Sequence, residues 1–271
     1  MDNNKEQRPD RYSKALTIAG SDSGGGAGIQ ADLKTFITRG VYGMSILTAA
    51  TAQNTVGVQA VTELPCEFVS QQFDSVLSDI EVDAAKTGMI SSARMVEVVS
   101  QKAREYKLTR LVVDPVMVAK GGYLLLEPGA RKVLVEKLLP LAFVVTPNLY
   151  EAGILSGIEN VNDRASMEAA AKKIKHFGPT HVVIKGGHLE EDASDLLYDG
   201  SSFQVFSSKK ISSICTHGAG CTFSAAITAE LSKGINVVDA VANAKQFVTR
   251  GIKGGFPIGS GHAPLHHGVD L

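Results

Sequence analysis

The sequence predicts an α/β protein with a mostly parallel central sheet covered by helices on both faces, a three-layer α/β/α sandwich. Short apolar runs of strand length alternate with amphipathic stretches of helix length along nearly the whole chain. Several of these runs end abruptly in glycine, a carboxylate or an amide, as expected where buried parallel strands reach a ligand-binding edge. No linker and no internal repeat interrupts the alternation, so the pattern indicates one continuous sheet.

Composition and charge indicate which classes of protein this sequence fits. The chain has 271 residues, of which 44% are hydrophobic and 20% charged, with a net charge of −1. This suits one large domain at residues 14–271 after a flexible polar tail at residues 1–13, although length alone also permits two smaller domains. Near-zero charge disfavours nucleic acid or an anionic membrane as the main partner. Three cysteines without CxxC spacing and a polar start without a signal-peptide pattern indicate free thiols and a cytoplasmic protein.

The first half of the chain begins with a predicted strand at residues 15–20, followed by a glycine-rich loop and a helix that ends near Gly40. Further elements follow in order: a strand at 43–52, a helix over 68–77, a short strand at 84–87 and a helix at 93–106. The loop GSDSGGGAG at residues 20–28 resembles a dinucleotide-binding turn, but the GxGxxG spacing with a later acidic residue is not met. The alternative is a loop whose glycines let the backbone close over a small ligand. Asp32 in the following helix either compensates the helix dipole or faces that ligand.

The second half continues the alternation. We predict strands at residues 111–116, 143–148 and 181–187, a flexible loop at 119–122, a hairpin over 196–206, and helices at 165–177, 221–233 and 237–252. The tail at 259–267 reads as loop, and its histidines lack the spacing of metal ligands on a helix. The hairpin would add antiparallel strands to one side of the sheet.

The segment THGAGCT at residues 216–222 is the strongest candidate for a functional turn. Its two glycines allow backbone N–H groups to converge on one point, and Phe223, Ile227 and Leu231 then mark a helix. Free N–H groups and the positive end of the helix dipole predict an anion site, where Cys221 would have a lowered thiol pKa. The alternative is an ordinary capped loop with Cys221 as a small, inert buried residue. No Gly-Lys-Ser/Thr follows, so this is not a P-loop.

Polar residues at other strand ends are further candidates. Asp114 ends a buried strand, and Asn148 and Glu151 are spaced to share one helix face, which suits either a hydrated Mg²⁺ or a helix cap. Lys185 lies at the end of a predicted strand, where its side chain would contact either a phosphate group or solvent. Gln53 follows a strand as a turn residue or a ligand-reading amide. Met89, taken alone, is typical of core packing.

Seven segments in order closely resemble a known family: AGSDSGGGAGIQAD (19–32), AQNT (52–55), KTGM (86–89), VDPVM (113–117), TPN (146–148), KGGH (185–188) and THGAGCT (216–222). Together they resemble the bacterial hydroxymethylpyrimidine and phosphomethylpyrimidine kinases of thiamin synthesis, in the ribokinase superfamily. The resemblance covers residues 14–268. It implies a ribokinase-like α/β/α fold, MgATP as phosphoryl donor and a homodimer.

The resemblance also implies roles for particular residues. Gly218, Ala219 and Gly220 would form the anion hole for the transferred phosphate, and Cys221 would take the place of the catalytic base of related sugar kinases. The nucleotide and its phosphates would be bound by Asp114, Thr146, Asn148, Glu151, Lys185, Thr216, Gly218 and Gly220, with Asp114 and Glu151 near Mg²⁺. The pyrimidine pocket would contain Gly20, Ala27, Asp32, Gln53 and Met89. One departure is Ala219, where the family commonly has Thr.

Other functions stay open at this point. Pyridoxal or pyridoxine kinases share the frame, although the QNT segment at 53–55 favours the pyrimidine as substrate. A non-catalytic ligand sensor would fit the fold but not the intact Gly218, Gly220, Cys221 and Asp114. An oxidoreductase rests only on the first glycine loop.

Overall fold

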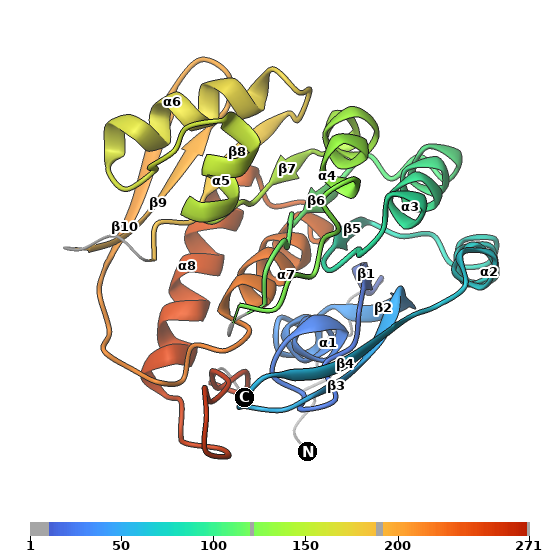
Figure 1. Ribbon diagram of the computed structural model, residues 1–271, viewed down its shortest axis with the longest axis horizontal. Coiled ribbons are helices and arrows are strands. Elements are labelled where there is room, and N and C mark those ends of the chain that lie inside the picture. Colours follow the sequence, from blue (N-terminus) through green and yellow to red (C-terminus); the bar gives the residue numbers. More distant parts are fainter. Residues whose placement is uncertain (1–10, 120–121, 188–191, 270–271) are drawn as a thin grey trace, which may run out of the picture.

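The computed structural model describes residues 11–119, 122–187 and 192–269. Its central sheet has eight strands, shown in Figure 1, that lie side by side in the order β10 (Phe203–Lys209), β9 (Asp192–Tyr198), β8 (His181–Ile184), β7 (Val144–Val145), β6 (Leu111–Val113), β5 (Ala84–Thr87), β1 (Lys14–Ala19) and β2 (Tyr42–Leu47). The six strands from β8 to β2 are parallel to one another. Strand β9 pairs in antiparallel fashion with β8 on one side and with β10 on the other. The predicted sheet and its terminal hairpin are confirmed.

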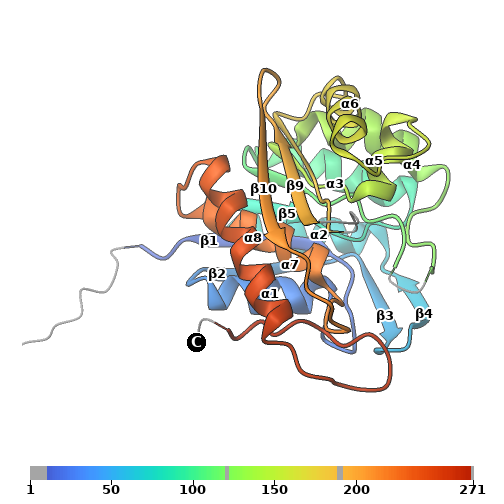
Figure 2. The same ribbon diagram turned by 90° about the vertical axis from the view of Figure 1, so that its left-hand side faces the viewer.

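Helices cover both faces of this sheet (Figures 1 and 2). One face is covered by α1 (Gly28–Thr38), α7 (Ala219–Ser232) and α8 (Val237–Lys253). The other is covered by α2 (Cys66–Leu77), α3 (Ala93–Glu105), α5 (Leu149–Ser156), α6 (Arg164–Lys175) and a helical stretch made of α4 (Ala130–Val133), η1 (Leu134–Leu138) and η2 (Leu139–Leu141). The predicted three-layer α/β/α sandwich is therefore confirmed.

Burial on both faces explains why the strands read as apolar runs. In β1, Leu16 and Ile18 belong to the core beneath α2 to α6, whereas Ala15 packs with Phe36 of α1 on the opposite face. Successive side chains of a strand point to opposite faces, so a strand covered by helices on both sides has no position for a solvated residue.

Helix α7 is the most deeply buried helix of the fold. Every residue from Thr222 to Ser232 is buried, and the helix packs against β1, β5, β6, α1 and α8. Its alanines keep the helix narrow on the side that meets α1, where Ala225 and Ala229 lie beside Phe36. The amino end of α7 is thereby held rigidly at the sheet.

The expectation of one strand at residues 43–52 is wrong. The chain turns at Thr48, whose buried hydroxyl donates to the carbonyl of Met89 at 2.8 Å. Beyond this corner, β3 (Ala49–Gln53) leaves the main sheet and pairs with β4 (Val58–Glu63) in a separate two-stranded sheet. The uninterrupted apolar run concealed the corner. Strand β4 was missed because its sequence, VQAVTE, is half polar, as its exposed positions require.

Smaller differences concern element ends. The strands predicted at 111–116 and 143–148 are shorter than expected, and the helical stretch from Ala130 to Leu141 was not predicted. Helix α5 begins directly after Asn148. Residues 1–10 of the predicted tail, part of the loop at 119–122 and His188 lie outside the described residues.

Candidate active site

The carboxyl ends of the parallel strands β1, β5, β6, β7 and β8 meet at one edge of the sheet, because the strands run the same way. The residues that follow them include Gly20, Asp114, Thr146 and Lys185. Helix α7 presents its amino end to this edge, since Ser224 in its second turn donates to Asp114 Oδ2 at 3.1 Å. Ligands of open α/β sheets bind at such an edge, so the structure brings these predicted residues together.

The turn before α7 has the geometry of an anion site. Gly218 is the N-cap and has φ +76°, a conformation that side chains disfavour. The N–H of Ala219 donates to the carbonyl of Thr216 at 3.3 Å. The helix itself offers no acceptor to the next N–H groups, those of Gly220 and Cys221, because first-turn amides lack an intrahelical partner. These amides and the helix dipole favour an anion there.

A buried ion pair lies beside this helix end. Lys185 Nζ donates to Asp114 Oδ1 at 2.7 Å, and Thr146 Oγ1 donates to the same oxygen at 3.2 Å. A Cβ added to Gly220 would lie 3.4 Å from Lys185 Nζ, so the ammonium group is next to the first turn of α7. Burial disfavours the charged amine, but the Asp114 and Glu151 carboxylates outweigh it and raise the Lys185 pKa. Lys185 is therefore a fixed cation.

Asn148 and Glu151 form a capping box at the start of α5. The Glu151 N–H donates to Asn148 Oδ1 at 2.9 Å, and the Asn148 N–H donates to Glu151 Oε2 at 2.8 Å. Burial and the Asp114 carboxylate raise the pKa of Glu151 to about 7, although Lys185 opposes them. The capping alternative thus describes the local contacts, and a role near Mg²⁺ stays a prediction.

The donor set at this edge suits a metal ion shared with phosphates. Among the described residues, no group of three or more His, Cys, Asp and Glu side chains is placed to hold a metal. The Asp114 carboxylate nevertheless disfavours ionisation of Glu151 and helps to raise the Glu151 pKa. Mg²⁺ often binds through one or two carboxylates, waters and substrate phosphates. The two carboxylates fit that mode.

The expectation that the helix end lowers the Cys221 pKa is wrong. Removal of the thiol from water raises its pKa to about 11, and the Asp32 and Asp114 carboxylates add to the increase. The Lys86 ammonium and the Gly28 N–H act in the opposite direction without overcoming it. In the free protein, Cys221 is consequently a protonated thiol at neutral pH.

Asp32 is fully buried and paired inside the protein. Its Oδ2 accepts from Lys86 Nζ at 2.9 Å and from Thr17 Oγ1 at 2.6 Å, and the Lys86 and Asp32 side chains are both inaccessible to solvent. The other oxygen, Oδ1, has no hydrogen-bond partner within the described part of the chain. This pair lies behind Cys221, whose acidity both charges affect. Lys86 had no assigned role in the sequence interpretation, and substrate binding by Asp32 stays a prediction.

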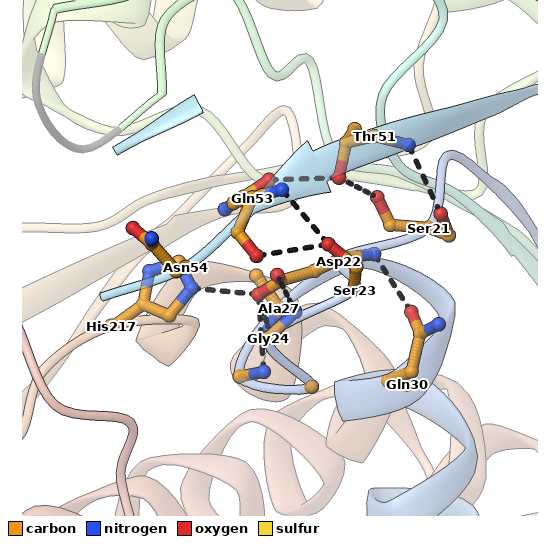
Figure 3. Close-up of polar contacts among 12 residues, drawn as sticks. Ser21, Asp22, Ser23, Gly24, Ala27, Gln30, Thr51, Gln53, Asn54 and His217 are labelled. Atoms are coloured by element: carbon orange, nitrogen blue, oxygen red, sulfur yellow. Dashed lines mark hydrogen bonds and ion pairs between the residues drawn. The ribbon is translucent and has the colours of Figure 1, made fainter. Parts of the chain in front are cut away.

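The first glycine loop, residues 20–28, is fastened to the β3 end (Figure 3). Ser23 Oγ donates to the carbonyl of Gln53 at 2.9 Å, and Ser23 Oγ in turn accepts from the Gln53 N–H at 2.8 Å. Thr51 Oγ1 donates to the carbonyl of Ser21 at 2.9 Å. These contacts hold Gln53 over the loop.

Gly20 and Met89 also adjoin each other at this edge. A Cβ added to Gly20 would lie 2.5 Å from the terminal methyl of Met89, and Met89 is largely buried. Ala27, the N-cap of α1, closes the opposite end of the loop. The predicted pocket residues Gly20, Ala27, Gln53 and Met89 thus border one loop, whereas Asp32 lies beneath it.

His217 and Asp22 join this loop to the turn before α7. His217 Nε2 lies 2.8 Å from Asp22 Oδ2, across 195 positions of sequence. Both residues belong to the motifs found in the sequence, but no role was predicted for either. A carboxylate within a glycine-rich loop, where it can collect N–H groups, was the available signal.

Known proteins share much of this sequence and fold. The phosphomethylpyrimidine kinase family model matches residues 22–266. The hydroxymethylpyrimidine/phosphomethylpyrimidine kinase of Bacillus subtilis is 49% identical over 94% of each chain. The thiamine biosynthesis bifunctional protein of Geobacter sulfurreducens is 51% identical over 93% of this chain, which spans about half (51%) of that relative. A structure of Staphylococcus aureus pyridoxal kinase with AMP-PCP and pyridoxal has a TM-score of 0.88 and 40% identity, covering 96% of this chain and 95% of that one.

Proposed function

Because the chain belongs to the phosphomethylpyrimidine kinase family, we propose that it transfers phosphate from ATP to hydroxymethylpyrimidine and to its monophosphate in thiamine biosynthesis. The observation that carries this proposal is the Lys185–Asp114 ion pair beside the amino end of α7. A fixed cation, free backbone amides and two carboxylates at one edge are the elements that phosphoryl transfer requires.

The turn at residues 218–220 would bind the phosphate that is transferred. Its amides meet charge that develops on phosphate oxygens, and Lys185 adds a positive charge from β8. Asp114 holds Lys185 in place and is itself fixed by Thr146 and Ser224. This arrangement is preorganised, so little reorientation of the protein accompanies the transfer.

Mg²⁺ bound with ATP would supply charge neutralisation across the phosphates. Asp114 and Glu151 would hold that ion together with phosphate oxygens and water. A cation beside Glu151 would favour its ionised form and so lower its raised pKa. The Asn148 N–H, which donates to Glu151, and the Thr146 hydroxyl, which donates to Asp114, would keep the two carboxylates oriented.

Cys221 would orient the hydroxymethyl group of the substrate. A thiol with a pKa of about 11 holds its proton at neutral pH, which disfavours a general-base role in the free enzyme. Positioning the acceptor hydroxyl for in-line attack is worth more to this reaction than covalent assistance. The hydroxyl proton would then pass to a phosphate oxygen.

The pyrimidine would bind over the first glycine loop, against Gly20, Ala27, Gln53 and Met89. Gln53 Oε1 lies 3.3 Å from Thr51 Oγ1, and the side-chain NH₂ group of Gln53 would donate to a ring nitrogen. A second candidate substrate is pyridoxal, because the Staphylococcus aureus pyridoxal kinase shares 40% identity over nearly the whole chain.

Product analysis tests the proposal directly. The protein is incubated with MgATP and either hydroxymethylpyrimidine, its monophosphate or pyridoxal, and the products are identified by mass spectrometry. We expect higher kcat/KM with the pyrimidine and formation of the diphosphate. Preferential phosphorylation of pyridoxal would establish the second candidate, and no ATP-dependent product with any of the three would refute the kinase.

We further propose a cytoplasmic homodimer. Three free cysteines, Cys66, Cys215 and Cys221, fit a reducing compartment, and no helix among the described ranges is long and apolar enough to cross a membrane. The β3–β4 sheet stands apart from the main sheet with many exposed positions, which makes its outer face available to a second copy. Sedimentation equilibrium measures the oligomeric state.

A further inference from the structure

The first glycine loop and the turn before α7 interlock. A Cβ added to Gly218 would overlap the carbonyl oxygen of Gly26, and a Cβ added to Gly26 would overlap the imidazole ring of His217. Two segments almost 200 positions apart thus lie in direct contact through glycines in both. Neither can shift without displacing the other.

Asp22 fastens this contact. Its carboxylate accepts from the N–H groups of Gly24, Gly26 and Ala27 at 2.8, 3.0 and 2.8 Å, and lies 2.8 Å from His217 Nε2 (Figure 3). Asp22 is 2% exposed. Burial acts to raise its pKa, but the hydrogen bond and charge of His217 and the loop amides lower it. Asp22 is therefore an ionised group that orders its own loop and binds the opposite one.

His217 is equally constrained from its other side. Its N–H donates to the carbonyl of Ala263 at 3.0 Å, and its carbonyl accepts from the Leu265 N–H at 3.4 Å. The backbone of His217 therefore lies between the C-terminal segment and the glycine loop, directly before Gly218. The contact of the imidazole with Asp22 therefore links the glycine loop to the residue directly before the amino end of α7.

We propose that the Asp22–His217 pair couples the two ligand sites, so that a ring bound over residues 20–27 strengthens phosphate binding at residues 218–220 and the reverse. His217 acts as a positioning residue, because it contacts Asp22 and not the reacting atoms. The inference rests on the proposed function, which supplies the ring and the phosphate. Linkage requires the same coupling factor in both directions.

The test measures that factor in three proteins. The Kd of hydroxymethylpyrimidine is determined by calorimetry with and without saturating Mg²⁺ and AMP-PCP, for wild type, His217→Phe and His217→Gln. In wild type we expect tighter binding by a factor in the usual range of about 5–150. His217→Phe keeps a ring without the donor and should bring the factor close to one. His217→Gln places an N–H donor near the position of Nε2 and should restore part of it.

His267→Phe is the matched control. It removes a buried histidine of the C-terminal segment whose Nε2 lies 3.0 Å from Thr222 Oγ1 of α7, and it should keep the wild-type coupling factor. A purely structural role for His217 would lower both affinities and leave the factor unchanged.

Hydrogen exchange without ligands distinguishes failure of this inference from failure of the proposed function. A peptide covering residues 214–224 should exchange faster in His217→Phe than in wild type or His267→Phe. Wild-type exchange in that peptide, or an undiminished coupling factor in His217→Phe, overturns the inference. Absence of AMP-PCP binding to wild type would count against the kinase, and the exchange result would still decide whether His217 orders the turn.

Discussion

The acidity of Cys221 gives the sharpest test of the site electrostatics. Its pKa of about 11, against an ordinary value of 9.0, lowers the thiolate fraction at any pH below 9 by about 100-fold, since each unit of pKa is a factor of ten. Alkylation by iodoacetamide follows the thiolate. The rate at Cys221 should therefore rise tenfold per pH unit from pH 7 to 10 without reaching a plateau. Peptide mass spectrometry of quenched samples measures it.

Two variants test the cause of this shift. The Lys86 ammonium lowers the Cys221 pKa more than the Asp32 carboxylate raises it. Asp32→Asn should thus accelerate alkylation, whereas the double variant Asp32→Asn/Lys86→Met should slow it below wild type. The double variant also avoids an unpaired buried charge, which typically costs about 3–5 kcal/mol of stability. A plateau below pH 9 in wild type, or equal rates in all three proteins, would refute this account of the site.

We make further predictions about the site and the fold that supports it. Cys221→Ala should retain ATP binding, because the anion hole is backbone, and lose about 10²-fold in kcat through misplacement of the acceptor; near-normal turnover would contradict its role. Asp114→Asn should raise the Mg²⁺ concentration needed for half-maximal turnover, and an unchanged requirement with a lower Tm would make Asp114 structural only. Gly218→Ala should reduce the free energy of unfolding in urea by about 1–3 kcal/mol, because φ is +76° and the added methyl meets Gly26. Burial lowers the pKa of His267 to about 4 from 6.5, so the unfolded chain binds more protons in that interval and stability falls as pH drops from 6.5 to 4, by up to about 3 kcal/mol. His267→Gln should remove that slope, and an unaltered slope would assign it to other groups.

Strand ends were readable from sequence because burial imposes an abrupt change in polarity. Val113-Asp114 and Ile184-Lys185 mark such changes, and the structure pairs the two charged residues across β7. The corner at Thr48 was not readable, because the residues on both of its sides are apolar for different reasons. In β2, Met44 and Ile46 are buried in the main core, and in β3, alternate residues face inward from a separate sheet.

Contacts between residues far apart in the chain could not be predicted from local sequence patterns. Helix-end arguments count the amides near Cys221 but not the desolvation of its thiol or the carboxylates of Asp32 and Asp114. Likewise nothing in the sequence near Asp22 indicates His217 as its partner, since the contact depends on how α7 packs beside α1 on one face of the sheet. Only the assembled tertiary structure supplies these distances.

The deep burial of α7 has a consequence for synthesis of the chain. Ribosomes add about 5–20 residues per second, so the 195 positions that separate Asp22 from His217 take roughly 10–40 s to emerge. Until then, β1, β5 and β6 are present without the helix that covers one of their faces. The nascent sheet exposes apolar surface during that interval. Truncation before residue 232 would leave that face of β1, β5 and β6 uncovered.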